Sequence, residues 1–570
     1  MDEGKLAIIV YQHDIASYQR LMGQLSLLEA PEIHGQLVDV EVVTVAGRGG
    51  RAAAYNAGMR QSSARYKVYL DTAVAWVNPE LLKRIIDIFK VTECAGMIGF
   101  FGSSLPLNGD FRHAKRKYGH FAWANPKDGN VMQTHGEAGI FNQRVQAVDA
   151  ACLATCVDVP WDEEVHEDFL ATAHVLSLQA EKWETVVPVD EEKDLYFVST
   201  RMSPYFAQLD ETVFEQARQR FIKRYAALVQ PLVSILIPAY NQPEFCREAL
   251  ESALQQEYEN IEIVIGDDST DDRVQAALAP LLEQHANIRY FYRGNLAGEN
   301  AFANIRFLLN ECHGGFVNLL FHDDLIYPSK IRKMMALLVE DIDEEIAFVT
   351  SKRESINAEG QSQGVIDSYG WSEDRVFTGL QLCPKMLLYR ENIVGEMSTV
   401  LLRKSLLRGK DGYDIGIFYG YQDPSMGDVS TWLELLRDGH ICVFLQEKLS
   451  AFRDHSEQNT HDPDTILLCL LDWLNFAVLA YLHRTYLREE ADFKSFCDGW
   501  GDVVQPVMSL LQSAVSPAKK AAIEICQQEA EAILRKDYHE AIRLSIRYMS
   551  STGADPKEFL AGITEKELCF

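Results

Sequence analysis

The sequence predicts an α/β protein in which two domains, each with an open, mostly parallel mixed sheet, precede an all-α C-terminal domain. Short buried apolar runs alternate with amphipathic helical segments from the N-terminus to about residue 460. Beyond residue 461 the apolar residues recur only at helical spacing, with polar breaks between segments. We therefore expect domains at residues 1–208, 231–461 and 462–570, with residues 209–230 as a connecting helix.

Residues 231–268 carry this pattern most clearly. Two apolar runs, residues 233–237 and 261–265, are stopped by Pro238 and by Gly266-Asp267-Asp268, as expected of buried parallel strands. Apolar residues between them recur at helical spacing. The segment is predicted to form a βαβ unit with polar residues at the carboxyl ends of its strands, where open α/β sheets bind ligands.

A third apolar run, residues 316–321, ends in His322-Asp323-Asp324. A single aspartate after a strand often does no more than make a turn or cap a helix. Two acidic clusters at successive strand ends of one sheet are instead typical of an active site. Paired carboxylates suit a hard divalent cation, which takes oxygen ligands and can bridge to a diphosphate.

Five segments of the chain together resemble a known family, the inverting nucleotide-sugar glycosyltransferases of family 2, which have the Rossmann-like GT-A fold. They span about residues 231–460 and occur in the family's order. The segments are SILIPAYNQPEFCREALESALQQEYENIEIVIGDDSTDD, NLLFHDDLIYPSKI, GEMSTVLLRKSLL, GDVSTWLELLRDGHICVF and AFRDHSEQN.

The resemblance implies roles for individual positions of the second domain. Tyr240 is expected to pack near the uracil or other base, Asp267 to accept from the base ring or the ribose, and Arg453 to offset phosphate charge. Phe321 stands where the family often has a further aspartate, so either carboxylate of the following pair could prove to be the metal ligand. The expected donor-binding residues are Pro238, Tyr240, Asp267, Asp268, Asp323 and Arg453, and the expected Mn²⁺ or Mg²⁺ ligands are Asp323, Asp324 and His455.

Asp428 is the expected catalytic base. It lies at the start of a predicted helix over residues 429–436, and the resemblance implies that it deprotonates the acceptor hydroxyl. The helix dipole should keep this carboxylate anionic and make it a weaker base. A plain helix-capping role is the alternative for Asp428, and Asp423 is the competing candidate for the base.

The formal net charge of −29 argues against nucleic acid or an anionic membrane surface as a partner, because phosphate binding needs clustered Lys and Arg. A nucleotide-sugar donor is also an anion. A bound cation and backbone amides would have to offset the repulsion locally, which is a further reason to expect a metal at the aspartate pair.

Eleven cysteines are scattered without metal-ligand spacing, which favours a reduced, cytoplasmic protein with buried thiols. The first residues enter a strand almost at once, with no basic and apolar leader. We expect no transmembrane segment, since the longest apolar region, residues 466–482, is interrupted by Asp472 and Asn475.

Residues 1–208 resemble a second, degenerate GT-A-like domain. Its expected strands include residues 6–11, 38–45, 66–70 and 96–101. Where the resemblance calls for a metal-binding aspartate, Asp71-Thr72-Ala73 offers Ala73, so this domain is expected to be a binding or docking module. Asp168 is its candidate base, although an acidic residue at a helix start can simply compensate the dipole.

The C-terminal domain is expected to contain helices at residues 465–487, 491–511, 517–535 and 538–549. Residues 530–549 resemble one tetratricopeptide-like helix pair, and a single pair does not establish an array. This tail is expected to brace the catalytic domain or to receive a protein partner.

The leading hypothesis is a metal-dependent, inverting hexosyl- or N-acetylhexosaminyl-transferase that uses a nucleotide-diphosphate donor, with a UDP-sugar as the first candidate. The acceptor would be a hydroxyl of a glycan or a protein. Two alternatives stay open: a bifunctional transferase with both domains active, and a non-catalytic scaffold that binds carbohydrate or nucleotide. A dinucleotide-dependent oxidoreductase is disfavoured because no Gly-x-Gly-x-x-Gly follows residues 233–237.

Overall fold

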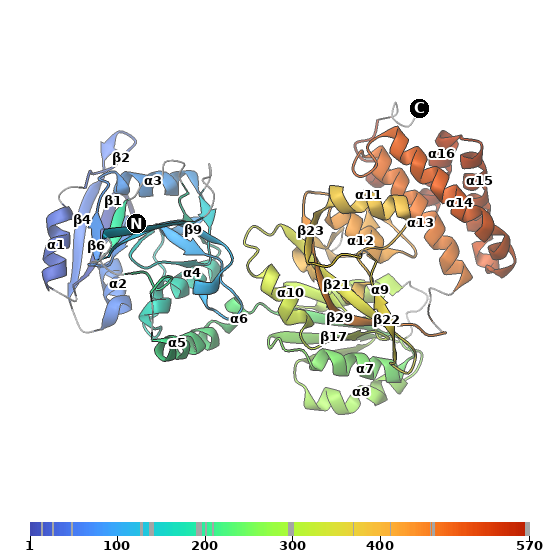
Figure 1. Ribbon diagram of the computed structural model, residues 1–570, viewed down its shortest axis with the longest axis horizontal. Helices are drawn as coiled ribbons and strands as arrows, with labels where there is room; N and C mark the ends of the chain where they lie inside the picture. Colours follow the sequence, from blue (N-terminus) through green and yellow to red (C-terminus); the bar gives the residue numbers. More distant parts are fainter. Residues whose placement is uncertain are drawn as a thin grey trace. The chain divides into compact units, whose positions relative to one another are not determined.

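The chain divides into two units, each with its own sheets and core (Figure 1). Unit 1 comprises residues 1–231 and 336–343, and unit 2 comprises residues 232–335 and 344–570. The expected boundaries at residues 208, 209 and 461 lie outside the described residues. The computed structural model describes residues 1–12, 15–25, 28–46, 49–125, 129–135, 142–189, 196–199, 202–207, 210–294, 301–368, 370–410, 412–456, 458 and 462–564.

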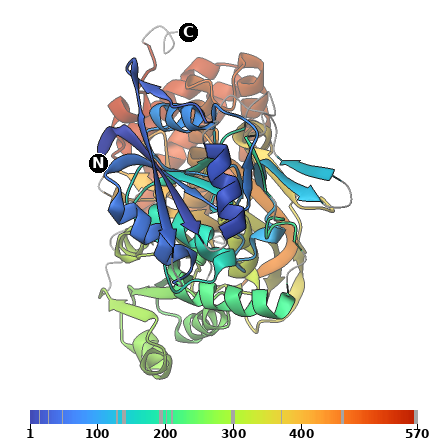
Figure 2. The same ribbon diagram turned by 90° about the vertical axis from the view of Figure 1, so that its left-hand side faces the viewer.

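Unit 1 is built on two mixed sheets. The first has the order β11-β14-β7-β13-β5-β1-β4 and the second the order β12-β8-β9-β15-β6. Strand β10 pairs with β9 in a hairpin, drawn in light blue in Figure 2. The strands are β1 Asp2–Gln12, β2 Glu32–Ile33, β3 Gln36–Leu37, β4 Asp39–Ala46, β5 Ala64–Leu70, β6 Val74–Trp76, β7 Ala95–Ile98, β8 Phe101–Ser103, β9 Lys117–Asn125, β10 Gly129–His135, β11 Gln143–Arg144, β12 Ala147–Val148, β13 Cys152–Thr155, β14 Glu184–Val187 and β15 Phe197–Ser199. The helices are α1 Ile15–Leu25, α2 Gly50–Gln61, α3 Leu81–Val91, α4 Leu170–Ala180, α5 Glu211–Arg224 and α6 Ala226–Val229.

One expected strand of unit 1 is divided in the structure. Residues 96–101 were predicted as a single run, but β7 ends at Ile98 and β8 begins at Phe101 in the other sheet. Gly99 lies between them, and a Cβ atom at this position would come within 2.8 Å of Val148. A strand that passes from one sheet to another turns a corner, and such corners favour residues that allow close approach of the backbone.

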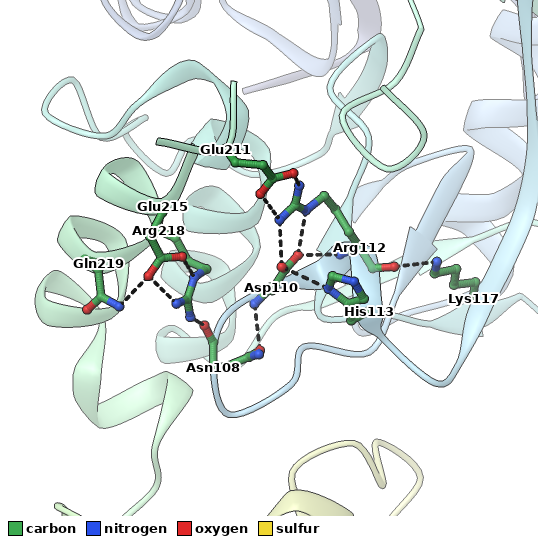
Figure 3. Close-up of polar contacts among 9 residues, drawn as sticks. All are labelled: Asn108, Asp110, Arg112, His113, Lys117, Glu211, Glu215, Arg218 and Gln219. Carbon is green, nitrogen blue, oxygen red and sulfur yellow. Dashed lines mark hydrogen bonds and ion pairs between the residues drawn. The ribbon is translucent and has the colours of Figure 1, made fainter. Parts of the chain in front are cut away.

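Helix α5 was expected to be a connector between domains. Charged side chains instead bind it to the rest of unit 1 (Figure 3). Arg112 Nε and Nη2 donate to the two carboxylate oxygens of Asp110 at 2.9 Å, and Arg112 Nη1 donates to Glu211 at 3.0 Å. The same guanidinium lies 3.7 Å from the ring centre of Phe214. Arg218 donates to the carbonyl of Asn108. Helix α5 is therefore part of unit 1, and Tyr225 separates it from α6.

Unit 2 is built on a mixed sheet in which β16, β17, β18 and β19 are parallel neighbours. The strand order is β18-β17-β16-β19-β24-β21-β29-β20, with β22 on β21 and β23 on β29. The strands are β16 Val233–Ala239, β17 Ile261–Asp267, β18 Ile288–Tyr292, β19 Phe316–Leu319, β20 Leu325–Ile326, β21 Ile346–Ile356, β22 Ser362–Ile366, β23 Arg375–Thr378, β24 Leu401–Arg403, β25 Arg408–Gly409, β26 Gly412–Tyr413, β27 Ile417–Phe418, β28 Tyr421–Gln422 and β29 Ile441–Arg453. The helices are α7 Pro243–Leu254, α8 Arg273–Gln284, α9 Ala301–Glu311, α10 Lys330–Leu338, α11 Gly379–Tyr389, α12 Gly427–Leu435, α13 Pro463–Leu482, α14 Glu490–Ala514, α15 Lys520–Leu534, α16 Tyr538–Ser551 and α17 Pro556–Phe559.

The C-terminal helices share one hydrophobic core with the sheet of unit 2. Leu471 and Leu474 of α13 belong to the same buried cluster as Trp432 of α12 and Phe444 of β29. Burial of this apolar surface is the main stabilisation that the tail receives. The tail therefore packs directly behind the helix that carries Asp428.

Helix α13, expected at residues 465–487, spans Pro463–Leu482 in the structure. It is 20 residues long and its most apolar 18-residue stretch has a mean hydropathy of 1.9, enough by length and composition to cross a bilayer. Most of it is nevertheless buried inside the unit, with 72% of its most apolar stretch covered. Asp472 and Asn475 lie fully buried on this helix with polar partners from other elements. These are the properties of a core helix.

Glu529 on α15 carries a buried carboxyl group that is expected to make the tail sensitive to pH. The side chain is fully buried, neither carboxyl oxygen has a hydrogen-bond partner among the described residues, and burial raises its pKa well above the usual range. Since the folded protein holds this proton more tightly, the resulting stability is complete below the unfolded pKa of about 4.5 and is lost as pH rises. Glu529→Gln should raise the free energy of unfolding at pH 8 by about 1–3 kcal/mol, and by less at pH 5.

Chemical denaturation at both pH values checks this expectation. Glu524→Gln, on the exposed face of the same helix, is the matched control and should change the unfolding free energy little at either pH. If the difference in unfolding free energy between Glu529→Gln and the wild type is no larger at pH 8 than at pH 5, the expected titration of Glu529 is contradicted.

Candidate active site

Three parallel strands of unit 2 end at one edge of the sheet. Val233 of β16 pairs with Ile261 of β17 on one side and with Phe316 of β19 on the other, and Ala239 pairs with Asp267. The segment after β19 turns back toward β16, because His322 Nδ1 lies 3.0 Å from the carbonyl oxygen of Pro238. The two acidic clusters predicted from the sequence therefore flank the end of one central strand.

Asp267 was expected to contact the base or the ribose, but its side chain points into the protein. Its side chain is fully buried, Tyr290 donates its hydroxyl to Oδ2, and the backbone N–H of Ser269 donates to Oδ1 at 2.9 Å. These contacts shape the loop after β17 and leave the carboxylate no exposed surface for a base ring or a ribose. Asp268 is partly exposed and Tyr240 is 42% exposed, so these two expected donor-binding residues keep surface that a nucleoside could reach.

Asp323 and His455 meet at the carboxyl end of the sheet. The Nε2 atom of His455 lies 3.2 Å from Asp323 Oδ2, and the ring of His455 packs 5.2 Å from that of Phe245. The two come from segments far apart in the sequence, and β29, which runs to Arg453, leads to His455 at this end of the sheet. The predicted proximity of these two side chains is thus present in the structure.

Asp324 is buried behind this pair. Only 2% of the residue is exposed, and Oδ1 accepts from the backbone N–H of Arg453 at 3.1 Å. Burial raises the pKa of Asp324 well above its usual range, and the neighbouring charges of Asp323 and Glu396 add to this. Lys330, which sequence reasoning did not single out, lies fully buried nearby, and burial lowers its pKa to about 7.

Arg453 does not fit the expected phosphate contact. Its guanidinium is fully buried, with Nη2 donating to Glu248 at 2.6 Å and Nε donating to the carbonyl of Asp323 at 2.8 Å. Its Nη1 atom donates to the carbonyl of Ala358 at 3.0 Å. Because these contacts occupy the guanidinium, Arg453 holds the loop that carries Asp323 in place and has no exposed face for a ligand.

The fit of these residues to a divalent cation is limited. Among the described residues, no three His, Cys, Asp or Glu side chains are grouped closely enough to hold a metal ion. Asp323 and His455 present one oxygen and one nitrogen 3.2 Å apart, a pair that could supply two ligands while a bound diphosphate supplies others. Asp324, the first expected ligand, lies deeper and is engaged by Arg453.

Asp428 lies in the first turn of α12 and is partly exposed. The helix cap is the preceding Met426, so Asp428 is not a simple capping residue. Its Oδ2 accepts from Asn392 Nδ2 at 2.6 Å and its Oδ1 from the N–H of Val429 at 2.7 Å. The pKa of Asp428 is raised to about 6, first by burial and also by the charge of Glu396, against the opposing effect of the Val429 N–H. The expected weakening by the helix dipole is therefore wrong, and the carboxylate is a stronger base than a free aspartate.

A loop over residues 392–396 links Asp428 to the strand-end cluster. Asn392 donates to Asp428 and also to the carbonyl of Gly395, and it accepts from the N–H of Gly395. Gly395 has a φ of 103°, a conformation that favours glycine. Glu396 is ion-paired with Arg353 at 2.5 Å, and its charge raises the pKa of both Asp324 and Asp428. The aspartate pair and Asp428 therefore border one region around Glu396.

Asp423, the competing base, has a structural role instead. It is fully buried, and its oxygens accept from the N–H groups of Ser425 and Met426 and from the hydroxyl of Ser430. A carboxylate closed off in this way offers no surface to an acceptor hydroxyl.

The corresponding strand end of unit 1 is closed by an ion pair. Asp71 follows β5, and its Oδ2 accepts from Arg51 Nη2 at 2.8 Å. Ala73 is buried and provides no second carboxylate. Asp168 contacts His166 at 3.3 Å within its own turn. A guanidinium already neutralises the single carboxylate of this strand end.

Both halves of the chain match known families of glycosyltransferases. Residues 7–225 match a glycosyltransferase-like family, and residues 234–385 match glycosyl transferase family 2. An uncharacterized glycosyltransferase of Rickettsia felis is 31% identical over 230 residues, which are 40% of this chain and 35% of that protein. A putative glycosyltransferase, EpsE, of Bacillus subtilis is 24% identical over 227 residues, covering 40% and 74%. This chain thus spans about a third of the length of the Rickettsia felis relative.

Solved structures of similar fold include Staphylococcus aureus TarS 1–349 in complex with UDP-GlcNAc, at 14% identity and a TM-score of 0.35. The match covers 56% of this chain and 92% of that one. Another is the mannosyltransferase PcManGT of Pyrobaculum calidifontis in complex with GDP-Man and Mn²⁺, at 14% identity and a TM-score of 0.34, covering 56% and 85%.

Proposed function

Because the chain is a family 2 glycosyltransferase with two GT-A-like domains, we propose that unit 2 transfers a sugar from a nucleotide-diphosphate donor to a hydroxyl group of a glycan or protein acceptor, with inversion. A UDP-sugar is the first candidate for the donor. The observation that carries the proposal is that the charge of Glu396 raises the pKa both of Asp324, which lies behind Asp323 at the strand ends, and of Asp428.

Asp428 is the proposed base of a single displacement. With a pKa of about 6 it is ionised at neutral pH and basic enough to accept a proton. The acceptor oxygen attacks the anomeric carbon as its proton passes to the Asp428 carboxylate. The bond between that carbon and the donor phosphate oxygen breaks, and the nucleoside diphosphate leaves with the electron pair. Asn392 fixes the carboxylate orientation through its hydrogen bond to Oδ2.

We propose that Asp323 and His455 would hold Mn²⁺ or Mg²⁺ together with the donor diphosphate. The bound cation would neutralise phosphate charge in a protein whose net charge is −29. Asp324 is expected to support Asp323 from behind, and Arg453 to anchor the loop. Tyr240, Asp268 and the backbone of Pro238 are the proposed nucleoside contacts, since Tyr240 and Asp268 retain exposed surface and Pro238 marks the strand end.

Unit 1 is proposed to be non-catalytic, because Arg51 pairs with Asp71 and Ala73 replaces a carboxylate. We further propose a cytoplasmic protein. The ten cysteines of the described part of the chain are all free, and eight of them are buried. A protein partner for the C-terminal helices stays a prediction.

A donor screen tests the proposed activity. Purified protein should slowly hydrolyse at least one of the common UDP-, GDP- or dTDP-sugars in the presence of Mn²⁺, because water can replace the acceptor at a transferase site. Release of the nucleoside diphosphate measures the rate. Absence of release from every donor, together with absence of Mn²⁺-dependent nucleotide binding by calorimetry, would favour the non-catalytic scaffold.

A further inference from the structure

A chain of buried polar side chains joins the C-terminal helices to the loop that precedes Asp428. We call it the Asp472 network. Asp472 Oδ2 accepts from Ser425 Oγ at 2.6 Å, and Oδ1 accepts from the hydroxyl of Tyr421 at 2.9 Å. Asn475 Nδ2 donates to the same hydroxyl at 3.1 Å, and Asn475 Oδ1 accepts from Ser545 Oγ of α16 at 2.6 Å. The network therefore connects α16 and α13 to residues 421–425.

Ser425 stands at the point where this network meets the helix of the proposed base. Its N–H donates to Asp423 Oδ1 at 3.1 Å while its hydroxyl donates to Asp472. Asp423 in turn accepts from the N–H of Met426 at 2.6 Å and from the hydroxyl of Ser430 in α12. The loop before Asp428 is thus held from both sides by buried carboxyl groups.

The burial of these groups indicates a geometric role. Asp472 and Asn475 are fully buried in an otherwise apolar helix, where polar groups cost free energy unless each is hydrogen-bonded. Burial raises the pKa of Asp472 to about 7 and raises that of Asp423 well above its usual range, and the charge of Asp472 adds to the rise at Asp423. The other titratable groups that face the pair are Asp428, Tyr421, Tyr548 and Cys469.

We propose that Asp472 is a positioning residue for the transfer reaction: through Ser425 it fixes the loop over residues 423–427 and so the direction of the Asp428 carboxylate. The C-terminal helices are then part of the catalytic unit and not an appended module. This inference rests on the proposed function, in which Asp428 is the base. A misplacement of about 1 Å at a reacting group can cost up to about 100-fold in rate, so a modest change in this loop should be visible in kcat.

Two variants test the proposal in the full-length protein. Asp472→Asn keeps the shape and removes one acceptor, and Ser425→Ala removes the donor to Asp472. Each should lower kcat by roughly 10- to 100-fold while the KM for the donor stays within about twofold, because the strand-end residues are untouched. Ser425→Thr retains a hydroxyl and should restore most of the loss. Glu524→Gln, an exposed carboxylate of the same tail, is the control and should leave kcat and KM unchanged.

Hydrogen exchange gives a reading that does not depend on turnover. Amide exchange over residues 421–430 should quicken in Asp472→Asn and Ser425→Ala, with no change over residues 233–268. Unchanged kcat in both variants of an active protein overturns the inference. So does equal loss in Ser425→Ala and Ser425→Thr, or a parallel rise in donor KM, since each would indicate general damage. A wild-type protein that neither transfers sugar from any donor nor hydrolyses any donor would instead contradict the proposed function.

Discussion

Asp428→Asn is expected to lower the rate of sugar transfer by roughly 100- to 10,000-fold with donor binding intact, the range associated with loss of a general base. Asparagine preserves the shape of the side chain, and its one carbonyl oxygen can still accept from the N–H of Val429 or from Asn392, so the fold of α12 should persist. What is lost is the group with a pKa of about 6 that accepts the proton of the acceptor hydroxyl. Transfer to acceptor and donor binding by calorimetry should be measured on the same preparation.

Asp438→Asn is the matched control, because Asp438 is an exposed carboxylate just beyond the end of the same helix. It should behave as the wild type. Transfer by Asp428→Asn at a substantial fraction of the wild-type rate would exclude Asp428 as the base. If the residual transfer then disappeared on Asp71→Asn in unit 1, the bifunctional alternative would gain direct support.

Asp323→Asn is expected to weaken the stimulation of donor turnover by Mn²⁺. The Asp323 carboxylate forms the oxygen half of the pair with His455, and an amide in its place is neutral and a poorer ligand for a hard cation. We expect kcat/KM for the donor to fall at least about 10-fold at saturating Mn²⁺, and the Mn²⁺ concentration for half-maximal activity to rise by a similar factor. A titration of activity against Mn²⁺ measures both quantities.

Glu359→Gln changes an exposed carboxylate of the same unit and should leave the Mn²⁺ titration unchanged. A normal Mn²⁺ titration in Asp323→Asn would place the cation elsewhere. Since Asp324 is buried and bonded to the backbone of Arg453, loss of stability without a specific change in Mn²⁺ response is the outcome expected for Asp324→Asn.

The architecture around the site could be predicted from the sequence because it depends on local patterns. The apolar runs at residues 233–237 and 261–265 became β16 and β17, and the parallel pairing put both acidic clusters at one sheet edge. The family resemblance was confirmed by the matches to both halves of the chain. Strand periodicity and the positions of stops are properties of short segments, which explains this success.

The orientation of individual side chains could not be predicted, because it depends on distant segments. Arg453 was expected to face a phosphate, but its guanidinium donates hydrogen bonds to Glu248 and to the carbonyl of Asp323. Asp267 was expected to face the nucleoside, but the hydroxyl of Tyr290, on the neighbouring strand, donates a hydrogen bond to one of its oxygens. Neither partner is marked by spacing or by a motif.

The basicity of Asp428 is a second property that could not be predicted from the sequence. A position in the first turn of a helix predicts a lowered pKa. Burial and the charge of Glu396 outweigh the helix effect, and both arise from tertiary packing. Asn392, which orients the carboxylate, likewise carried no recognisable signal.

Calorimetric titration of the wild-type protein with UDP, with Mn²⁺ and with EDTA, examines most directly whether the strand-end carboxylates of unit 2 form a cation-assisted nucleotide site. Binding that weakens at least about 10-fold on removal of Mn²⁺, and that loses this dependence in Asp323→Asn, is the predicted result. UDP binding of equal strength with and without the cation, or no UDP binding under either condition, would contradict it.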